Sequence, residues 1–458
     1  MSELRSLVEQ ARYLSREECE RIAKQALGYV TTAEGARVNI VSGSRGNTRF
    51  AVNQVSTGGD NFDTAVTITA YVGRRSASST TNQLDEAGLR QAVQTAERLA
   101  KLAPEDPEFM PELEAQQYQA GTNWSDATAS LDPLGRATAV RAITAPATSS
   151  GLVSTGYLDT RAGASAVANM KGLFAFSRST STALTTTVRT ADGSGSGWAG
   201  ASHHDWSRID PAALGARAAE KARASANPAA IEPGRYTVVF EPTAVGNLVQ
   251  FIANALNARN ADEGRSFFSK PGGGNKVGMK VVDERVTIAS DPFDADVAGS
   301  PFTAEGLPTQ RSVWIENGVV KTLNYDRFWA QKKGVTPTAS GGSLRMSGGS
   351  SSLEQMIAST PRGLLVTRFW YLRPVDQRTI LYTGLTRDGT FLIENGKISR
   401  AVKNLRFNDS PVFMLNNLEA LGTPVRVSAS EDGGPGQAIV VPPLKVRDFN
   451  FTSLSDAV

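Results

Sequence analysis

The residues best suited to chemistry in this sequence are few: one cysteine, Cys19, and two adjacent histidines, His203 and His204. A single cysteine excludes a disulfide within the chain and any cysteine-cluster zinc or iron–sulfur site. Two histidines exclude a three-histidine metal site, and adjacent residues point to opposite faces of a strand. We therefore interpret the pair as solvent-facing imidazoles beside Asp205 rather than as metal ligands.

Two glycine-rich runs do not match the motifs that they suggest. Residues 193–197 read GSGSG, with glycine where the G-x-S-x-G nucleophile motif needs serine. Residues 272–276 read GGGNK, which lacks the G-x-x-x-x-G-K-[ST] order of a phosphate-binding loop. We interpret the first run as a flexible loop and the second as a turn.

Oppositely charged residues that lie close together in the sequence do not indicate a specific function either. Arg406 lies close to Asp409, and Arg387 adjoins Asp388, and each combination suits a local ion pair at a turn. No two carboxylates stand out as an acid–base couple. The side chains alone therefore do not indicate a reaction.

Composition limits the class of protein. The chain has 458 residues, of which 40% are hydrophobic and 20% charged, so it is not largely disordered. Its net charge of only +3 argues against nucleic acid as a partner. The opening MSELRSLVEQ does not resemble a signal peptide, and no window approaches roughly 18 consecutive apolar residues, so we expect no membrane association and a cytoplasmic location.

The N-terminal part has the pattern of helices flanking a small sheet. Ser15 and Glu18 form a capping box that opens a helix, and Cys19 lies on its apolar face, which predicts a core thiol. Alternation around 38–40, 50–52 and 66–72 predicts three strands, and apolar spacing at 89–99 predicts a second helix.

The rest of the chain is rich in strand signals. Prolines at 104, 107 and 111 indicate a linker, and Asn-Gly pairs at 317–318 and 395–396 predict two hairpins, because both turn residues need positive φ. We predict an α+β fold with a small helix-flanked N-terminal sheet domain and a larger C-terminal domain of twisted antiparallel strands. The predicted units are residues 1–115, a strand-rich middle segment with connecting helices at 116–230, and 231–458.

Several segments together resemble the TldD/PmbA (TldE) family along nearly the whole chain. They are, in order, LDEAGLRQAVQTAERLAKLAPEDP, GRYTVVFEPTAVGNLVQFI, SFFSKPGGGNKVGMKVV, EGLPTQRSVWIENGVVKTLNYDR, YTGLTRDGTFLIENGKISRAVKNLRFNDS and VPPLKV. No single segment decides the matter, but their order and spacing do.

The resemblance implies that this chain lacks the family's zinc site. TldD members carry H-E-x-x-x-H on a helix, and its two histidines and a distant cysteine bind zinc while the glutamate acts as general base. Here Gln250, Phe251 and Ala255 take the three helix positions, and the cysteine position falls near Asp432. Since glutamine is a weak ligand and phenylalanine cannot accept a proton, the resemblance implies no catalytic residue and no metal in this chain.

This pattern is similar to the PmbA/TldE branch, whose members pair with a TldD-like catalytic subunit. The resemblance implies a non-catalytic subunit of a two-chain zinc metallopeptidase that degrades unfolded or modified peptides, including leader peptides. Zinc is then expected in the TldD-like partner, and a homodimer is possible without that partner. The alternatives are a stand-alone peptide-binding or regulatory protein, in keeping with the family's older label as a modulator of DNA gyrase, or a peptidase that uses unrecognised residues.

Five residues are candidates for peptide binding. Gln250 and Asn254 lie on the helix that replaces the zinc helix, and Thr383, Arg387 and Asp388 lie in the family-like TGLTRDG segment. The competing interpretation of all five is ordinary loop and helix-surface polarity.

Overall fold

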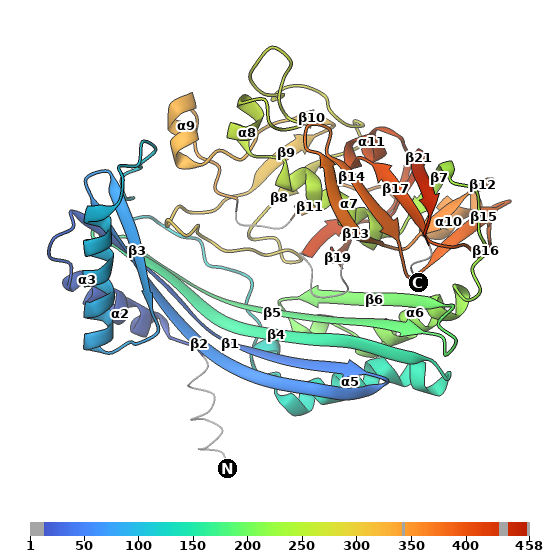
Figure 1. The fold of residues 1–458 in the computed structure, drawn as a ribbon, viewed down its shortest axis with the longest axis horizontal. Helices are drawn as coiled ribbons and strands as arrows, with labels where there is room; N and C mark the ends of the chain where they lie inside the picture. Colours follow the sequence, from blue (N-terminus) through green and yellow to red (C-terminus); the bar gives the residue numbers. More distant parts are fainter. Residues whose placement is uncertain (1–12, 341–343, 430–437, 456–458) are drawn as a thin grey trace.

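The computed structural model describes residues 13–340, 344–429 and 438–455. Within these residues the strands form three sheets, and the segment after residue 230 sits over the concave side of a long, curved N-terminal sheet (Figure 1). The prediction of an α+β fold with a helix-flanked N-terminal sheet and a larger C-terminal domain of antiparallel strands is confirmed. Among the described residues, no helix is both long and apolar enough to cross a membrane.

The N-terminal sheet is antiparallel and has the order β3-β2-β1-β4-β5-β6. Its strands are β1 (Gly35–Ala51), β2 (Gln54–Val72), β3 (Arg75–Thr81), β4 (Val153–Asn169), β5 (Phe174–Arg189) and β6 (Ser196–His203). The first predicted unit, 1–115, and the middle segment, 116–230, thus contribute strands to one sheet.

The long β1–β2 hairpin differs from the three short strands that the sequence predicts. Ala51 faces Gln54 across a two-residue turn at Val52 and Asn53, whose φ angles are 51° and 63°. The middle of the hairpin is polar and its β2 strand begins with ten consecutive exposed residues, so no alternation marks it. Backbone pairing keeps this stretch extended, and burial on one face is confined to alternate residues of β1.

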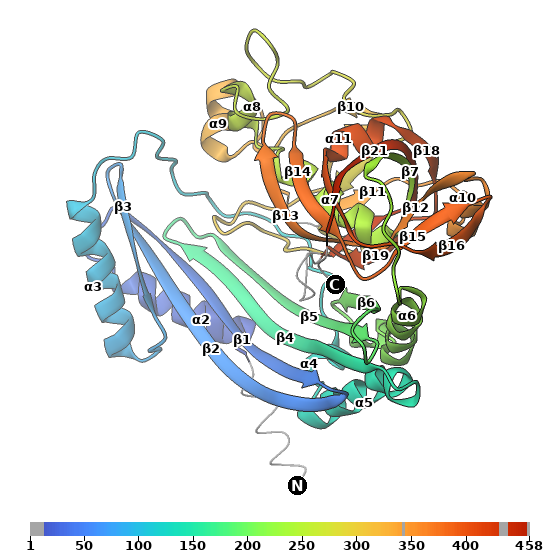
Figure 2. The same cartoon turned by 45° about the vertical axis from the view of Figure 1, so that its right-hand side comes forward.

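Helices cover one face of the N-terminal sheet at both of its ends. α2 (Arg16–Gly28) and α3 (Glu86–Leu102) pack at one end, and α5 (Pro133–Ser149) and α6 (Pro211–Ala224) at the other (Figure 2). On β4, Ala166 belongs to the first core and Leu158 to the second. Since these residues are an even number of positions apart, they share a face, and the odd-numbered residues of β4 face the C-terminal domain.

The start of α2 confirms the predicted cap and core thiol. Ser15 Oγ accepts from the Glu18 amide at 3.1 Å, and the Glu18 carboxylate accepts from the Ser15 amide at 2.7 Å. Cys19 is fully buried, and burial raises the pKa of its thiol to about 11. Such a thiol is protonated at neutral pH and is a core residue, not a nucleophile.

The C-terminal domain contains a nine-stranded and a six-stranded sheet. The larger has the order β13-β14-β17-β21-β7-β12-β15-β16, with β18 beside β21, and is antiparallel except between β7 and β12. Its strands are β7 (Gly234–Phe240), β12 (Arg362–Val366), β13 (Phe369–Asp376), β14 (Leu381–Thr386), β15 (Thr390–Glu394), β16 (Lys397–Ala401), β17 (Leu405–Asp409), β18 (Leu418–Leu421) and β21 (Leu444–Leu454).

The smaller sheet has the order β10-β9-β8-β11-β20-β19. Its strands are β8 (Ile288–Ser290), β9 (Ser312–Glu316), β10 (Val319–Val320), β11 (Leu344–Met346), β19 (Val425–Ser428) and β20 (Ala438–Val441). The remaining helices are α4 (Asp126–Ala129), η1 (Trp206–Arg208), α7 (Pro242–Asn254), α8 (Ala258–Asp262), α9 (Arg327–Lys333), α10 (Leu353–Ala358) and α11 (Pro411–Asn416).

Both Asn-Gly hairpins are confirmed. The first joins β9 to β10 and the second joins β15 to β16. The asparagines, Asn317 and Asn395, have φ angles of 48° and 51°, and the glycines that follow have φ angles of 77° and 76°. The repeated turn is therefore structural in both places.

The interpretation of residues 193–197 as a flexible loop is wrong for the last two of them. Ser196 and Gly197 are the first residues of β6, and both are buried. A Cβ atom on Gly197 would lie 2.2 Å from the carbonyl oxygen of Ala218 in α6. Glycine is thus required here by the close approach of strand and helix, which a single sequence does not reveal.

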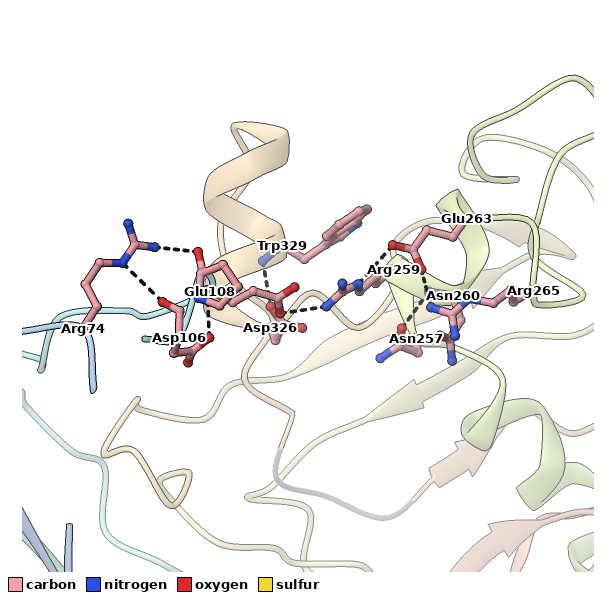
Figure 3. A network of polar contacts seen from close by, with 11 residues as sticks. Arg74, Asp106, Glu108, Asn257, Arg259, Asn260, Glu263, Arg265, Asp326 and Trp329 are labelled. Carbon is pink, nitrogen blue, oxygen red and sulfur yellow. Dashed lines mark hydrogen bonds and ion pairs between the residues drawn. The ribbon is translucent and has the colours of Figure 1, made fainter. Parts of the chain in front are cut away.

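A chain of polar contacts ties the N-terminal sheet to the C-terminal domain through the proline-rich linker (Figure 3). Arg74 donates to the carbonyl oxygens of Asp106 and Pro107 at 3.2 and 2.6 Å. Arg259 in α8 then pairs with the carboxylate of Glu108 at 2.7 Å and with that of Glu263 at 3.1 Å. The linker is therefore a bridge that fixes the relative positions of the two domains.

Candidate functional site

According to the family resemblance, helix α7 holds the positions that correspond to the zinc motif of TldD members. It follows β7, a strand with neighbours on both sides, and begins with Pro242 at its first position, where the missing N–H is not needed. The residue before it, Glu241, binds Lys221 of α6 at 2.5 Å. Because both of these side chains are largely buried, the start of α7 is fixed against the N-terminal domain.

Most of α7 is core. Six of its apolar or glycine residues are buried, and so is Asn247, which is fully inaccessible. The side-chain oxygen of Asn247 accepts from the amide of Phe369 at 3.1 Å, so a buried polar group is paired. The helix thus presents only its last turn for any function.

Gln250 uses its amide within the protein. Its Nε2 donates to the carbonyl oxygen of Asn247 at 3.0 Å and more weakly to that of Ala429, just after β19, at 3.4 Å. A histidine at this position would offer a ring nitrogen to a metal. The Gln250 side chain instead links α7 by a hydrogen bond to the backbone just after β19.

Phe251 fills the position of the family's general base with a ring. It stacks on Tyr382 of β14, with centroids 3.7 Å apart and planes inclined by 13°. Ala255, which takes the second histidine position, offers no ligand atom on its side chain, and its carbonyl oxygen accepts from Ser266. Asn254, the last residue of α7, is exposed.

These residue types do not fit a zinc ion. A tetrahedral zinc site needs about three protein ligands from histidine, cysteine or carboxylate side chains. Gln250, Phe251 and Ala255 supply none of these, and within the described ranges no group of three such side chains is arranged to hold a metal. Asp432, the expected cysteine position, lies outside the described residues.

The other candidate residues do not converge on α7. Thr383 follows Tyr382 on β14 and therefore points to the opposite face of the sheet, where its hydroxyl accepts from Arg406 at 3.4 Å. Thr383 and Phe251 thus lie on different sides of the same strand.

Asp388 and Arg387 lie at the boundary between the domains. Asp388 is 4% exposed, pairs with Arg368 at 3.2 Å and accepts from Ser196 of β6 at 2.5 Å. Arg387 lies over the ring of Trp370 at 4.2 Å, and burial lowers the pKa of its guanidinium. The geometry gives Asp388 an architectural contact, and peptide binding by any of the five candidates stays a prediction.

A polar cleft of about 400 Å³ lies between the domains, and sequence reasoning missed it. His203 and His204 line it with ring centroids 4.4 Å apart, together with Arg161 of β4 and Arg426 of β19. The histidines are half-buried and lie on the cleft rather than on the outer surface. β6 ends at His203, which is why the two rings need not point apart.

The histidines of the cleft are held neutral. The amide of Asp205 donates to His203 Nδ1 at 2.9 Å, so the proton of the neutral ring sits on Nε2. Burial, followed by the charge of Arg426, lowers the pKa of His203 to about 4 and also lowers the pKa of His204. No sequence signal joins residues 161, 203 and 426; only the packing of β4 and β6 against β19 does.

This fold, with α7 at its centre, is that of a known family of metallopeptidases. Residues 36–100, 105–226 and 233–453 match the PmbA/TldA metallopeptidase domain 1, central domain and C-terminal domain, in that order. The chain belongs to the PmbA/TldD family.

Individual relatives are distant. A metalloprotease of Methanothermobacter thermautotrophicus is 28% identical over 53% of this chain and 55% of its own length. A TldD homolog of Buchnera aphidicola is 27% identical over 48% of each chain. The chain thus spans about half the length of these curated relatives.

The crystal structure of TldE from Thermococcus kodakarensis has the same fold. It superposes with a TM-score of 0.83 at 17% identity and covers 95% of this chain and 100% of its own.

Proposed function

We propose that this chain is a non-catalytic, TldE-like subunit of a two-chain zinc metallopeptidase that degrades unfolded or modified peptides. One observation carries the proposal: the three helix positions that serve zinc chemistry in TldD members hold an amide bonded to backbone, a stacked phenyl ring and a methyl group. Zinc and the general base would belong to a TldD-like partner.

The surface of the β1–β2 hairpin supports an association with another chain. β2 pairs with β3 only from Val66 to Val72, so in the described structure its first half has an unpaired edge. Val52, Val55 and Phe62 on this hairpin are 70, 50 and 54% exposed. An unpaired edge with apolar side chains is a template for pairing with a partner, and an obligate interface buries roughly 2,000 Å² or more.

Co-expression tests the proposal. The chain and a TldD-like protein from the same organism should co-elute as one complex, and the complex should cleave an unfolded peptide in a chelator-sensitive manner. Replacing the glutamate of the partner's H-E-x-x-x-H motif should abolish cleavage, whereas Gln250→Ala in this chain should leave most of it, because the Gln250 amide donates to the backbone carbonyl oxygens of Asn247 and Ala429.

Two results would reject the proposal. Chelator-insensitive cleavage by this chain alone would make it an independent peptidase. Absence of any complex, with peptide binding by the isolated chain, would favour a stand-alone peptide-binding or regulatory protein.

A further inference from the structure

The cleft has a polar floor formed by the N-terminal sheet. Asp159 faces Ala183 across β4 and β5, Ala183 faces Ser202 across β5 and β6, and Arg161 faces Ser181. Facing residues of paired strands point to the same side, so these side chains share the face that looks toward the C-terminal domain. Serine hydroxyls and charged groups, with the small side chain of Ala183 between them, line this face at the cleft.

The roof contributes a guanidinium without an acidic partner. Arg426 donates through Nε to the carbonyl oxygen of Ser202 and, in the described part of the chain, forms no ion pair. The nearby carboxylates of Asp294 and Asp296 bind Arg345 instead, at distances of 2.6 to 2.9 Å. Burial lowers the pKa of Arg426 to about 10, as expected for a buried charge that lacks full compensation.

The acid on the floor is already neutralised. Asp159 accepts from Arg45 at 2.5 Å and from Arg161 at 2.9 Å. Two arginines thus share one carboxylate, and Arg426 adds a further positive charge. With both histidines neutral, the charged residues that line the cleft are Asp159, Arg161 and Arg426, and the carboxylates of Asp294 and Asp296 also act on Arg426 from nearby.

Three buried polar atoms of residues that line the cleft lack a hydrogen-bond partner among the described residues. They are the hydroxyls of Thr182 and Ser202, which can donate or accept, and the side-chain oxygen of Asn123, an acceptor. A buried polar group without a partner is costly, so such atoms mark a place where a ligand or water completes the bonding. A donor and an acceptor beside arginines fit a group that both accepts and donates.

We propose that this cleft binds a carboxylate of an extended peptide, together with the peptide N–H beside it. The carboxylate would accept from Arg426, Arg161 and the hydroxyl of Ser202, and the N–H would donate to Asn123. A volume of about 400 Å³ suits a short peptide segment. The inference rests on the peptide-binding role proposed above and assigns part of the recognition to this chain. The carboxylate is either the C-terminus or an Asp or Glu side chain.

Fluorescence anisotropy with the full chain tests the proposal and separates the two sources. The probes are short fluorescein-labelled alanine–serine peptides: one with a free C-terminal carboxylate, one with a C-terminal amide, and one amidated peptide with an internal aspartate. We expect the free acid to bind about tenfold more tightly than the amide, in line with charge-assisted hydrogen bonds. Tight binding of the aspartate peptide as well would extend recognition to side chains, and weak binding would restrict it to the terminus.

Matched variants locate the effect. Arg426→Gln should reduce the affinity for the free acid to that for the amide, and Arg426→Lys should retain part of the preference. Arg400→Gln removes the same charge from β16, an edge strand of the nine-stranded sheet, and should change nothing. If Arg426→Gln does not fold, wild-type protein serves: acetate should displace the free-acid peptide, and acetamide should not.

Equal affinities for the acid and the amide, or an unchanged preference in Arg426→Gln, would overturn the proposal. These outcomes are distinct from failure of the proposed function, which is read from complex formation and cleavage. A carboxylate preference without any complex would keep the cleft and reject the subunit role, and a complex without the preference would reject the cleft alone.

Discussion

The last turn of α7 and the interdomain cleft both lie beside β19, but the polar groups of the two regions are paired differently. Near α7, Gln250 bonds to the carbonyl oxygen of Ala429 and Phe251 stacks on Tyr382. At the cleft, Arg426 of β19 faces a polar floor and donates a hydrogen bond to the carbonyl oxygen of Ser202. In the first region Gln250 is hydrogen-bonded within the protein, whereas in the second the Ser202 hydroxyl and the Asn123 side-chain oxygen have no hydrogen-bond partner among the described residues.

The difference between these two regions indicates that, in a family member without the zinc motif, a functional site is to be sought away from α7. The position of the family's chemistry is filled by packing side chains, which stabilise the fold. The cleft to which we assign peptide binding lies instead where the two domains meet, and both domains contribute its charged side chains.

The largest expected effect concerns the ion pair between Arg368 and Asp388 at the boundary between the two domains. Asp388→Asn removes the carboxylate from a pair whose side chains are both 3% exposed, and leaves the charge of Arg368 buried without it. We expect the free energy of unfolding to fall by about 3 kcal/mol, measured by urea denaturation.

Asp448→Asn is the matched control for this variant. Asp448 also has a positive φ angle, 58° against 55° for Asp388, but its side chain is 58% exposed. A loss of stability no larger than in this control would show that the buried pair does not hold the boundary.

A smaller effect is expected at α7. Phe251→Ala removes the ring that stacks on Tyr382, and because this ring is only partly buried we expect a loss of about 2 kcal/mol in unfolding free energy. The carboxylate preference of the cleft should not change. Asn254→Ala, at the exposed end of the same helix, should change stability by less than about 0.5 kcal/mol. Loss of peptide preference in Phe251→Ala would contradict the separation of the two regions.

The smallest effect concerns pH. His203 takes up a proton near its ordinary pKa of 6.5 in the unfolded chain, but only near pH 4 in the folded protein. Its contribution to stability is therefore complete above about pH 6.5 and is lost as the pH falls toward 4. Because the ring is half-buried and partly screened by water, we expect about 1 kcal/mol.

His203→Asn isolates this titration. Asparagine can still accept from the Asp205 amide but does not titrate, so unfolding free energy should fall less between pH 6.5 and 5 than in the wild type. Identical pH profiles would mean that His203 titrates normally and that the cleft is open to water.

Parts of the fold could be predicted because their signals are local. The capping box at Ser15 and Glu18, the buried face that includes Cys19, and the two Asn-Gly hairpins depend on residues a few positions apart. The long β1–β2 hairpin could not be predicted, since the residues buried along its middle on β1 are Ser42, Gly46 and Thr48 rather than apolar ones, and the start of β2 is exposed throughout.

For the candidate site, too, some features could be predicted from the sequence and others could not. The loss of zinc ligands at Gln250, Phe251 and Ala255 is visible in the sequence, because ligand identity is a property of residue type. The stacking of Phe251 on Tyr382 is not, since 131 positions separate residues that only the sheet brings together.

The sequence by itself determined the fold class, the family and the absence of zinc-binding side chains on α7. The tertiary structure decided where uncompensated charge lies. Whether Arg426, Arg161 and His203 are ordinary surface groups or the lining of a cleft depends on β19 packing over β4 and β6. Burial and pairing, not residue type, set the free energy of a charged group, and both are defined only once distant segments have met.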